Sequence, residues 1–148
     1  MNEMLLKSKY VKAEEGETVM VVGTPVRFIL ESKDSGGQIS IWENRVPVGM
    51  GVPPHTHAHD DEIFFVQRGS FEVQVGEATY LANPGDLVFM PRNVPHSYRN
   101  AGDIEAVILA MATPAGKEEF FREFSRVDLS AGMDEAVEVA GRHGIAFV

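Results

Sequence analysis

The sequence predicts an all-β fold, a barrel or sandwich of short strands, that ends in a short helical segment. Runs rich in Val, Ile, Phe and Tyr are separated by turn residues at intervals of roughly eight to twelve residues, which is the spacing of strands in such folds. The pattern changes to helical spacing after Pro114. We expect one domain over residues 1–148, with a barrel core at about 18–113 and a helical tail at about 116–148.

The strands are predicted from apolar runs bounded by turn signals. Gly76 and Glu77 separate two such runs, and a Gly in the first place of a two-residue loop favours a type II′ hairpin turn. Pro and Gly in the centre of Asn83–Asp86 favour a type II turn. Prolines and glycines also interrupt Pro47–Pro54, which is predicted to be a loop or a bent edge. The predicted strands are Val19–Val22, Val26–Glu31, Gln38–Val46, Glu62–Gln67, Phe71–Val75, Ala78–Leu81, Leu87–Met90, His96–Arg99 and Ile104–Ala112.

Two helices are predicted in the tail. Within Lys117–Phe124, three aromatic residues recur at helical spacing, at Phe120, Phe121 and Phe124. A second helix is predicted over Met133–His143, with Ser130 as the candidate N-cap and Gly144 as the residue that ends it. The tail is expected to pack on the barrel as a short helical segment.

Composition narrows the classes of partner. The formal net charge is −9, and an acidic surface repels phosphate backbones and anionic lipids, so we expect no nucleic-acid and no membrane partner. The chain has no cysteine, which excludes disulfides, thiolate zinc sites and a cysteine nucleophile. No apolar run approaches the ~18 residues that span a bilayer, and Met1–Lys12 has no apolar stretch of signal-peptide length. We therefore expect a cytoplasmic protein whose partners are small molecules, metals or another copy of the chain.

A histidine cluster carries the candidate chemistry. His55 and His57 lie two residues apart, so on a strand both point to the same side, and His59 would follow them if the strand continued. Glu62 comes shortly after, and His96 lies further along the chain. Imidazole and carboxylate together suit a divalent Fe, Mn, Ni, Co, Cu or Zn ion. Two histidines at this spacing also occur in solvated polar turns, so the cluster alone does not decide between the two interpretations.

The glycines and prolines around the cluster favour the metal site. Gly49, His55, His57, Glu62 and Gly69 stand at the spacing of the first cupin motif, and Gly85, Pro91, His96 and Asn100 stand at that of the second. The chain therefore resembles a small single-domain cupin. Asn93 stands where the second motif usually has Gly, and Asn also tolerates left-handed backbone conformations. Residues Thr113–Gly116 and Glu118–Phe121 are similar to the tail of quercetin dioxygenase-like cupins.

The resemblance implies a fold and a metal site. It implies a double-stranded β-helix, or jelly-roll barrel, with one divalent metal bound by His55, His57, Glu62 and His96. It also implies a homodimer, because such cupins pair their barrels, often by exchanging N-terminal strands; Val19–Val22 is the candidate strand here. The neighbours His59, Asp60 and Asp61 are not motif ligands, and we interpret them as a solvated turn.

Three functions are compatible with such a site. The first is a metal-dependent dioxygenase with Glu62 as catalytic base; strand parity then places Phe64 and Tyr98 on the faces of Glu62 and His96, as an aromatic lining for a small aromatic or enolic substrate. Barrel core is the alternative role for both rings. The second function is a non-catalytic cupin that binds or senses a small molecule. The third, a sugar isomerase, needs basic residues in the pocket, and no spacing places an arginine there.

Overall fold

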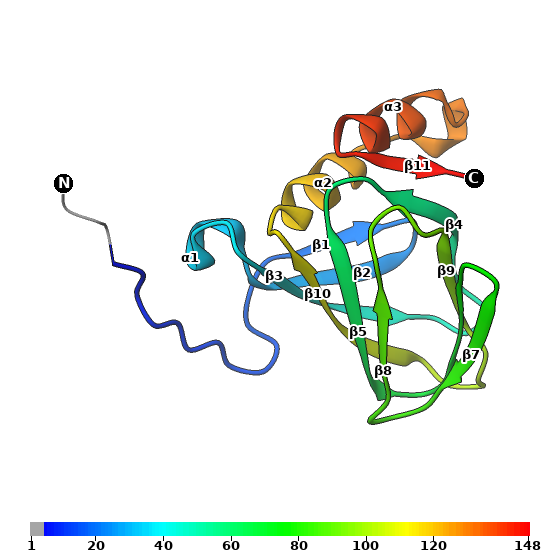
Figure 1. The fold of residues 1–148 in the computed structure, drawn as a ribbon, viewed down its shortest axis with the longest axis horizontal. Coiled ribbons are helices and arrows are strands. Elements are labelled where there is room, and N and C mark those ends of the chain that lie inside the picture. Colours follow the sequence, from blue (N-terminus) through cyan, green and yellow to red (C-terminus); the bar gives the residue numbers. More distant parts are fainter. Residues whose placement is uncertain (1–4) are drawn as a thin grey trace.

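The computed structural model describes residues 5–148 and shows two antiparallel sheets packed face to face (Figure 1). Within these residues, the first sheet has the spatial order β1 (Thr18–Val21), β2 (Thr24–Leu30), β3 (Ser40–Val46), β10 (Ala106–Thr113), β5 (Asp61–Arg68), β8 (Leu87–Met90). The second has the order β11 (Ile145–Phe147), β4 (Gly51–His57), β9 (His96–Asn100), β6 (Phe71–Val75), β7 (Ala78–Ala82). The predicted all-β jelly roll of the cupin type is confirmed.

The core lies between the two sheets and follows the period of two that strands impose. On β10, which lies between β3 and β5, Ala106, Ile108, Ala110 and Ala112 all face the interior and are at most 1% exposed. The other sheet contributes Phe71 and Val73 from β6, which are equally buried. Small side chains on one sheet leave room for large ones on the other, as close packing requires.

Motif residues outside the histidine cluster stabilise the turns of the barrel through hydrogen bonds and left-handed backbone conformations. Asn100 is 1% exposed; its amide donates to the carbonyls of Val46 and Ile104 and accepts from the amide of Gly102. Gly69 has φ +72°, and a Cβ there would lie 2.7 Å from Ala106 Cβ, so only glycine fits. Asn93 has φ +67°, a left-handed conformation that Asn tolerates where the motif usually has Gly.

Two segments of the barrel refine the sequence prediction. Of the two alternatives predicted for Pro47–Pro54, the bent edge holds in its second half, because β4 begins at Gly51 and β11 pairs with it only from His55 to His57. Its pairing with β9 shifts register between Val52 and His55, since prolines in this interval have no N–H to donate to the ladder. Between the predicted strands Val26–Glu31 and Gln38–Val46 the chain forms a single helical turn, α1 (Ser32–Ser35), which ends on Gly36 at φ 65°.

The tail covers one end of the barrel, as Figure 1 shows, with α2 (Lys117–Phe124), η1 (Leu129–Ala131) and α3 (Asp134–Arg142). The prediction of Ser130 as N-cap of the second helix is wrong, because the N-cap of α3 is Met133, without a side-chain hydrogen bond. Ser130 lies in η1 instead, where Asp128 is the N-cap and its carboxylate accepts from the Ser130 amide. The tail then ends in a strand, β11, that helical periodicity did not predict; it pairs with β4. In residues 5–148 the helices are all too short or too polar to cross a membrane.

Candidate metal centre

Three strands bring the predicted ligands together. His55 and His57 lie at the end of β4, and Glu62 is the second residue of β5. His96 begins β9, where it pairs directly with His55. The three imidazole ring centres lie 4.4–4.9 Å apart. One potential ligand atom from each histidine lies within 4.8 Å of those of the other two, and His57 forms a second such group with Asp60 and Glu62. His55 and His96, 41 positions apart in sequence, thus meet at one end of the barrel.

The free ring nitrogens suit a metal ion. Nε2 of His57 and Nε2 of His96 are both buried and have no hydrogen-bond partner. They lie 3.6 Å and 3.4 Å from the two carboxylate oxygens of Glu62, which is longer than a good hydrogen bond. Buried polar atoms normally find a partner, so these two lone pairs beside a carboxylate fit a cation between them. His57, His96 and Glu62 are each at most 5% exposed.

The opposite ring nitrogens are fixed by neighbouring acceptors. Nδ1 of His55 lies 2.8 Å from the Pro53 carbonyl, and Nδ1 of His96 lies 3.2 Å from the Val94 carbonyl. Nδ1 of His57 lies 3.1 Å from Asp60 Oδ2. In His55 and His96 the Nδ1–H can donate to its acceptor, which leaves the Nε2 lone pair free to bind a metal; such partners orient ligand histidines in metal sites generally. Nδ1 of His57 has two neighbours: it can donate to Asp60 Oδ2 or accept from Lys117 Nζ at 2.6 Å, and only the first tautomer leaves its Nε2 lone pair free.

Lys117 is a part of the site that sequence reasoning missed. It is the first residue of α2, is only 5% exposed, and donates to Asp60 Oδ1 at 3.0 Å while its Nζ lies 2.6 Å from His57 Nδ1. The interpretation of Asp60 as part of a solvated turn is wrong, because the tail buries it against Lys117 and His57. His59 is exposed, as expected of a solvated turn. Asp61 instead begins β5, and its side chain pairs with Arg92.

Burial and neighbouring charges shift the pKa values of Glu62 and His55. Burial alone raises the pKa of Glu62, but His57, His96 and Lys117 outweigh it and hold that pKa below its usual value. Burial, assisted by the adjacent His96, lowers the pKa of His55 to about 4. Glu62 is therefore ionised and His55 neutral near pH 7, which are the protonation states in which these side chains bind metals.

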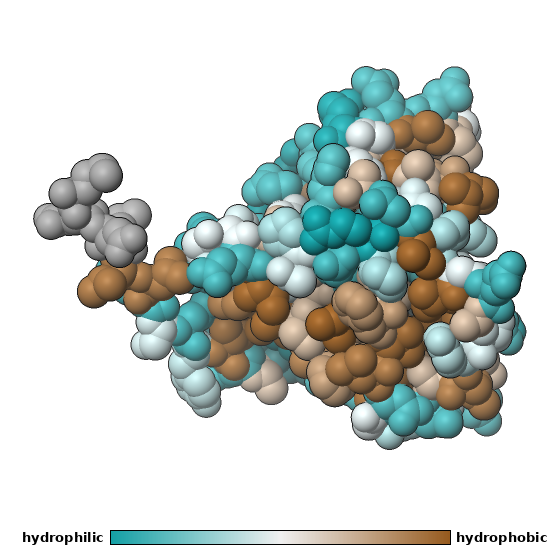
Figure 2. Space-filling model, in the orientation of Figure 1, coloured by the Kyte–Doolittle hydropathy of each residue, from teal (hydrophilic) through white to brown (hydrophobic). Residues whose placement is uncertain are grey.

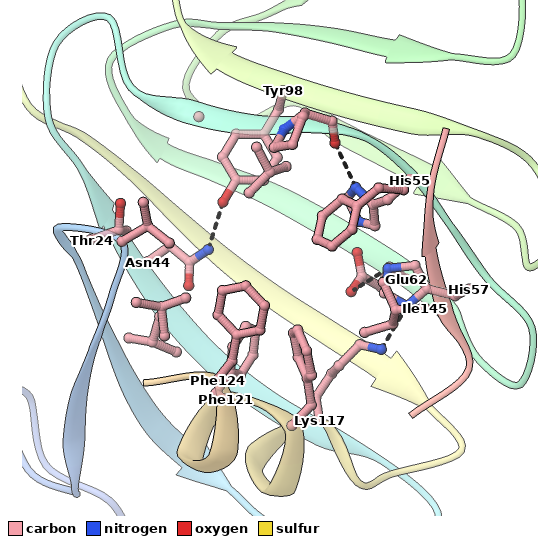
Figure 3. A pocket seen from close by; sticks show the side chains of 18 of the residues that line it. Thr24, Asn44, His55, His57, Glu62, Tyr98, Lys117, Phe121, Phe124 and Ile145 are labelled. Atoms are coloured by element: carbon pink, nitrogen blue, oxygen red, sulfur yellow. Dashed lines mark hydrogen bonds and ion pairs between the residues drawn. The ribbon is translucent and has the colours of Figure 1, made fainter. Parts of the chain in front are cut away.

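A cavity of about 290 Å³ opens from the cluster into the barrel (Figure 3). Phe64 and Tyr98 both line it, with their rings 5.2 Å apart in an edge-to-face contact. Val66 is core and does not reach it. The tail supplies the opposite wall. The helical spacing of the phenylalanines predicted a helix there but not that its side chains line the cavity. That wall consists of Phe120, Phe121, Phe124, Leu129, Met133, Ile145 and Phe147.

The cavity offers little to an anionic substrate. Among the lysines and arginines of residues 5–148, only Lys117 lines it, and Lys117 is already paired with Asp60. Most of the lining is aliphatic or aromatic. The arrangement of a His/Glu cluster at one end and an apolar pocket beside it defines a barrel that can bind a metal and a small, largely apolar molecule.

Comparison with known proteins supports the resemblance to cupins. Residues 42–112, which include all four predicted ligands, match the family model described as "Cupin domain". Over these residues, which are about half of the chain, the protein is similar to cupins.

The chain is similar to two curated enzymes. It is 25% identical over 112 residues to quercetin 2,3-dioxygenase of Bacillus subtilis, a match that covers 76% of this chain and 33% of that protein. It is 29% identical over 102 residues to quercetin 2,3-dioxygenase of Aspergillus japonicus, covering 64% and 29%. The chain thus spans about a third of the length of either enzyme. Among solved structures, KdgF from Halomonas sp. superposes with a TM-score of 0.68 at 18% identity over 76% of this chain and 99% of that one.

Proposed function

We propose that the protein is a metal-dependent dioxygenase that acts on a small aromatic or enolic substrate, with one divalent Fe, Mn, Ni, Co, Cu or Zn ion held by His55, His57, Glu62 and His96. The observation that carries the proposal is the pair of buried, unpartnered histidine Nε2 atoms beside Glu62, open to an aromatic cavity. Similarity to two quercetin 2,3-dioxygenases over about two thirds or more of this chain supports the same class of reaction.

The residues of the site would have distinct roles in this reaction. A bound divalent metal would supply a Lewis acid for the substrate oxygens and an electron relay toward O2. Glu62 takes the hydroxyl proton of an enol at a carboxylate oxygen, acting as the general base. Phe64 and Tyr98 hold the substrate ring by edge and face contacts. The tail phenylalanines exclude water from the reacting atoms.

Oxygen uptake tests this function. With an enol or flavonol substrate and each of the candidate metals in turn, we expect uptake by the wild type that depends on metal. Glu62→Gln should lower it at least about 100-fold, since general base catalysis contributes about 10²–10⁴. The matched control is Glu77→Gln, an exposed glutamate on the β6–β7 hairpin, which should leave uptake unchanged. Metal content is measured on each variant so that loss of base and loss of metal are distinguished.

The same experiment separates the alternatives. Tight binding of these compounds with no oxygen uptake under any metal would refute the dioxygenase and favour the binding or sensing cupin. A sugar-phosphate isomerase has little support here, because the one lysine that lines the cavity within residues 5–148 is engaged by Asp60.

We also propose a homodimer. The outer face of the first sheet exposes Phe65, Leu87 and Phe89 on neighbouring strands, where Phe65 pairs with Leu87. Figure 2 shows the apolar patch that covers β5 and β8 in this view. β8 and β1 are the edges of this sheet, and open edges and apolar patches both favour covering by a partner. Val19–Val22, which includes most of β1, is the candidate for strand exchange.

Light scattering at micromolar concentration checks the dimer. We expect a mass about twice that of the 16.3 kDa chain. Phe89→Glu should yield monomers, since it places a charge in the patch, whereas Leu81→Glu, 63% exposed on β7 of the other sheet, should leave the dimer intact. A monomeric wild type would refute the proposal.

A further inference from the structure

A second polar group faces the cavity from the side opposite the histidines. Asn44 lies on β3, is 5% exposed, and donates through Nδ2 to the Tyr98 hydroxyl oxygen at 2.9 Å. Its other amide atom, Oδ1, is buried without a hydrogen-bond partner. Burial of a hydrogen-bond acceptor that has lost its water and has no other donor costs free energy. A bound ligand that donates a hydrogen bond would remove this cost. Both Asn44 and Tyr98 line the cavity.

The two polar ends are well separated. Figure 3 shows Asn44 and Tyr98 on one side of the pocket and His55, His57 and Glu62 on the other. On β10, Asn44 is opposite Ile108 and Glu62 is opposite Ala112. Four residues at about 3.3 Å each place the two positions about 13 Å apart along that strand. The length suits an aromatic ligand with a polar group at each end.

The space between the two ends is apolar. Phe121 and Phe124 from the tail and Phe64 from β5 line it. At about 290 Å³ the cavity lies at the lower limit of ligand pockets, which run from about 300 to 1,000 Å³. A ligand that fills it therefore has an aromatic body of modest size and touches the Asn44–Tyr98 pair at its far end.

We propose that Asn44 and Tyr98 form a specificity subsite for a phenolic hydroxyl at the end of the substrate that points away from the His/Glu cluster. Asn44 Oδ1 accepts a hydrogen bond from the phenol hydroxyl. The Tyr98 hydroxyl, whose oxygen accepts from Asn44, keeps its own proton to donate to the phenol oxygen. The inference rests on the proposed function for the orientation of the substrate, and it adds the chemical group that the distal end selects.

The subsite discriminates between close analogues. A phenol satisfies the acceptor and the donor together. A methyl ether can only accept, so it leaves Asn44 Oδ1 unpartnered, and a ligand with hydrogen at that place leaves both unpartnered. Sites built to hydrogen-bond a hydroxyl reject analogues that lack it more strongly than apolar pockets reject a missing methylene.

Binding of three flavonols to metal-loaded protein tests the subsite. The first has an unsubstituted pendant ring, the second a para-hydroxyl and the third a para-methoxy group on that ring; calorimetry gives the Kd of each. We expect the hydroxylated flavonol to bind the wild type about 5- to 30-fold more tightly than the other two, which is the effect of one or two hydrogen bonds. Asn44→Leu should abolish this preference while retaining affinity for the unsubstituted flavonol.

Further variants keep the test decisive. Tyr98→Phe removes the hydroxyl that donates to the phenol and accepts from Asn44 Nδ2, but it keeps Asn44 Oδ1. It should reduce the preference in part, which covers the case in which Asn44→Leu does not fold. Asn83→Leu, an exposed asparagine between β7 and β8, is the matched control and should keep the wild-type preference.

The outcomes separate this inference from the proposed function. Equal affinities in the wild type, a preference that survives in both Asn44→Leu and Tyr98→Phe, or no binding of the hydroxylated flavonol would overturn the subsite. Equal affinities with metal-dependent oxygen uptake would leave the dioxygenase standing. A hydroxyl preference lost in Asn44→Leu without any oxygen uptake would support the subsite and refute the dioxygenase.

Discussion

His57→Ala is expected to lose nearly all bound metal, from about one ion per chain to less than about a tenth. His57 contributes one of three imidazoles that converge, and its Nε2 is buried with no partner other than the neighbouring Glu62 carboxylate. Loss of a residue that merely orients a ligand already costs about 10–100-fold in metal affinity, so loss of the ligand should cost at least as much. Elemental analysis of dialysed protein, purified without added metal, gives the ratio of metal to chain.

His59→Ala is the matched control. It is the same substitution two residues further along, and its side chain is exposed. We expect it to keep the wild-type metal content. Full metal retention in His57→Ala would contradict the assignment of ligands, and equal loss in both variants would indicate damage to the turn rather than to the site.

Phe71→Ala is expected to reduce the free energy of unfolding by about 3–5 kcal/mol, the cost of truncating a buried Phe. Phe71 is fully buried on β6 and packs edge-to-face on Tyr98 with ring centres 5.8 Å apart. The cavity left behind cannot collapse easily, because β6 is paired on both sides. Urea denaturation measures the change, and Tm should fall by roughly 10–15 °C in a chain of this size.

Tyr80→Ala on the neighbouring strand β7 controls for the loss of an aromatic ring from the hairpin. Tyr80 is 49% exposed and pairs with Val73, so we expect a loss below about 1 kcal/mol. Similar losses in the two variants would contradict the position of Phe71 at the centre of the core.

The sequence allowed the barrel and the cluster to be predicted for a local physical reason. Strand parity alone places His55 with His57, and the parity of β5 places Phe64 with Glu62. A turn such as that at Gly69 needs a backbone conformation with positive φ. Because glycine adopts it most readily, the turn can be predicted from the residue type. Alternation and turn chemistry are local properties, and both can be read from a single chain.

The wall of the cavity could not be predicted in the same way. Lys117 reaches His57 only because α2 docks over the barrel end, and no spacing encodes that docking. The sequence around Asp60 predicts a solvated turn, but in the folded chain this lysine covers Asp60. The strand β11 is three residues long, too short for a periodicity signal, and it forms because β4 offers an open edge. The unpartnered oxygen of Asn44 likewise appears only when its neighbours are placed.

The most direct test of the central claim is to locate the metal in crystals of the wild-type protein by anomalous scattering. We expect one strong peak per chain, at about 2.0–2.2 Å from a ring nitrogen of each of His55, His57 and His96 and from a Glu62 oxygen, the usual lengths of such bonds. An absence of any peak among these four side chains in crystals grown with added divalent metal, or a sole peak elsewhere on the chain, would contradict it.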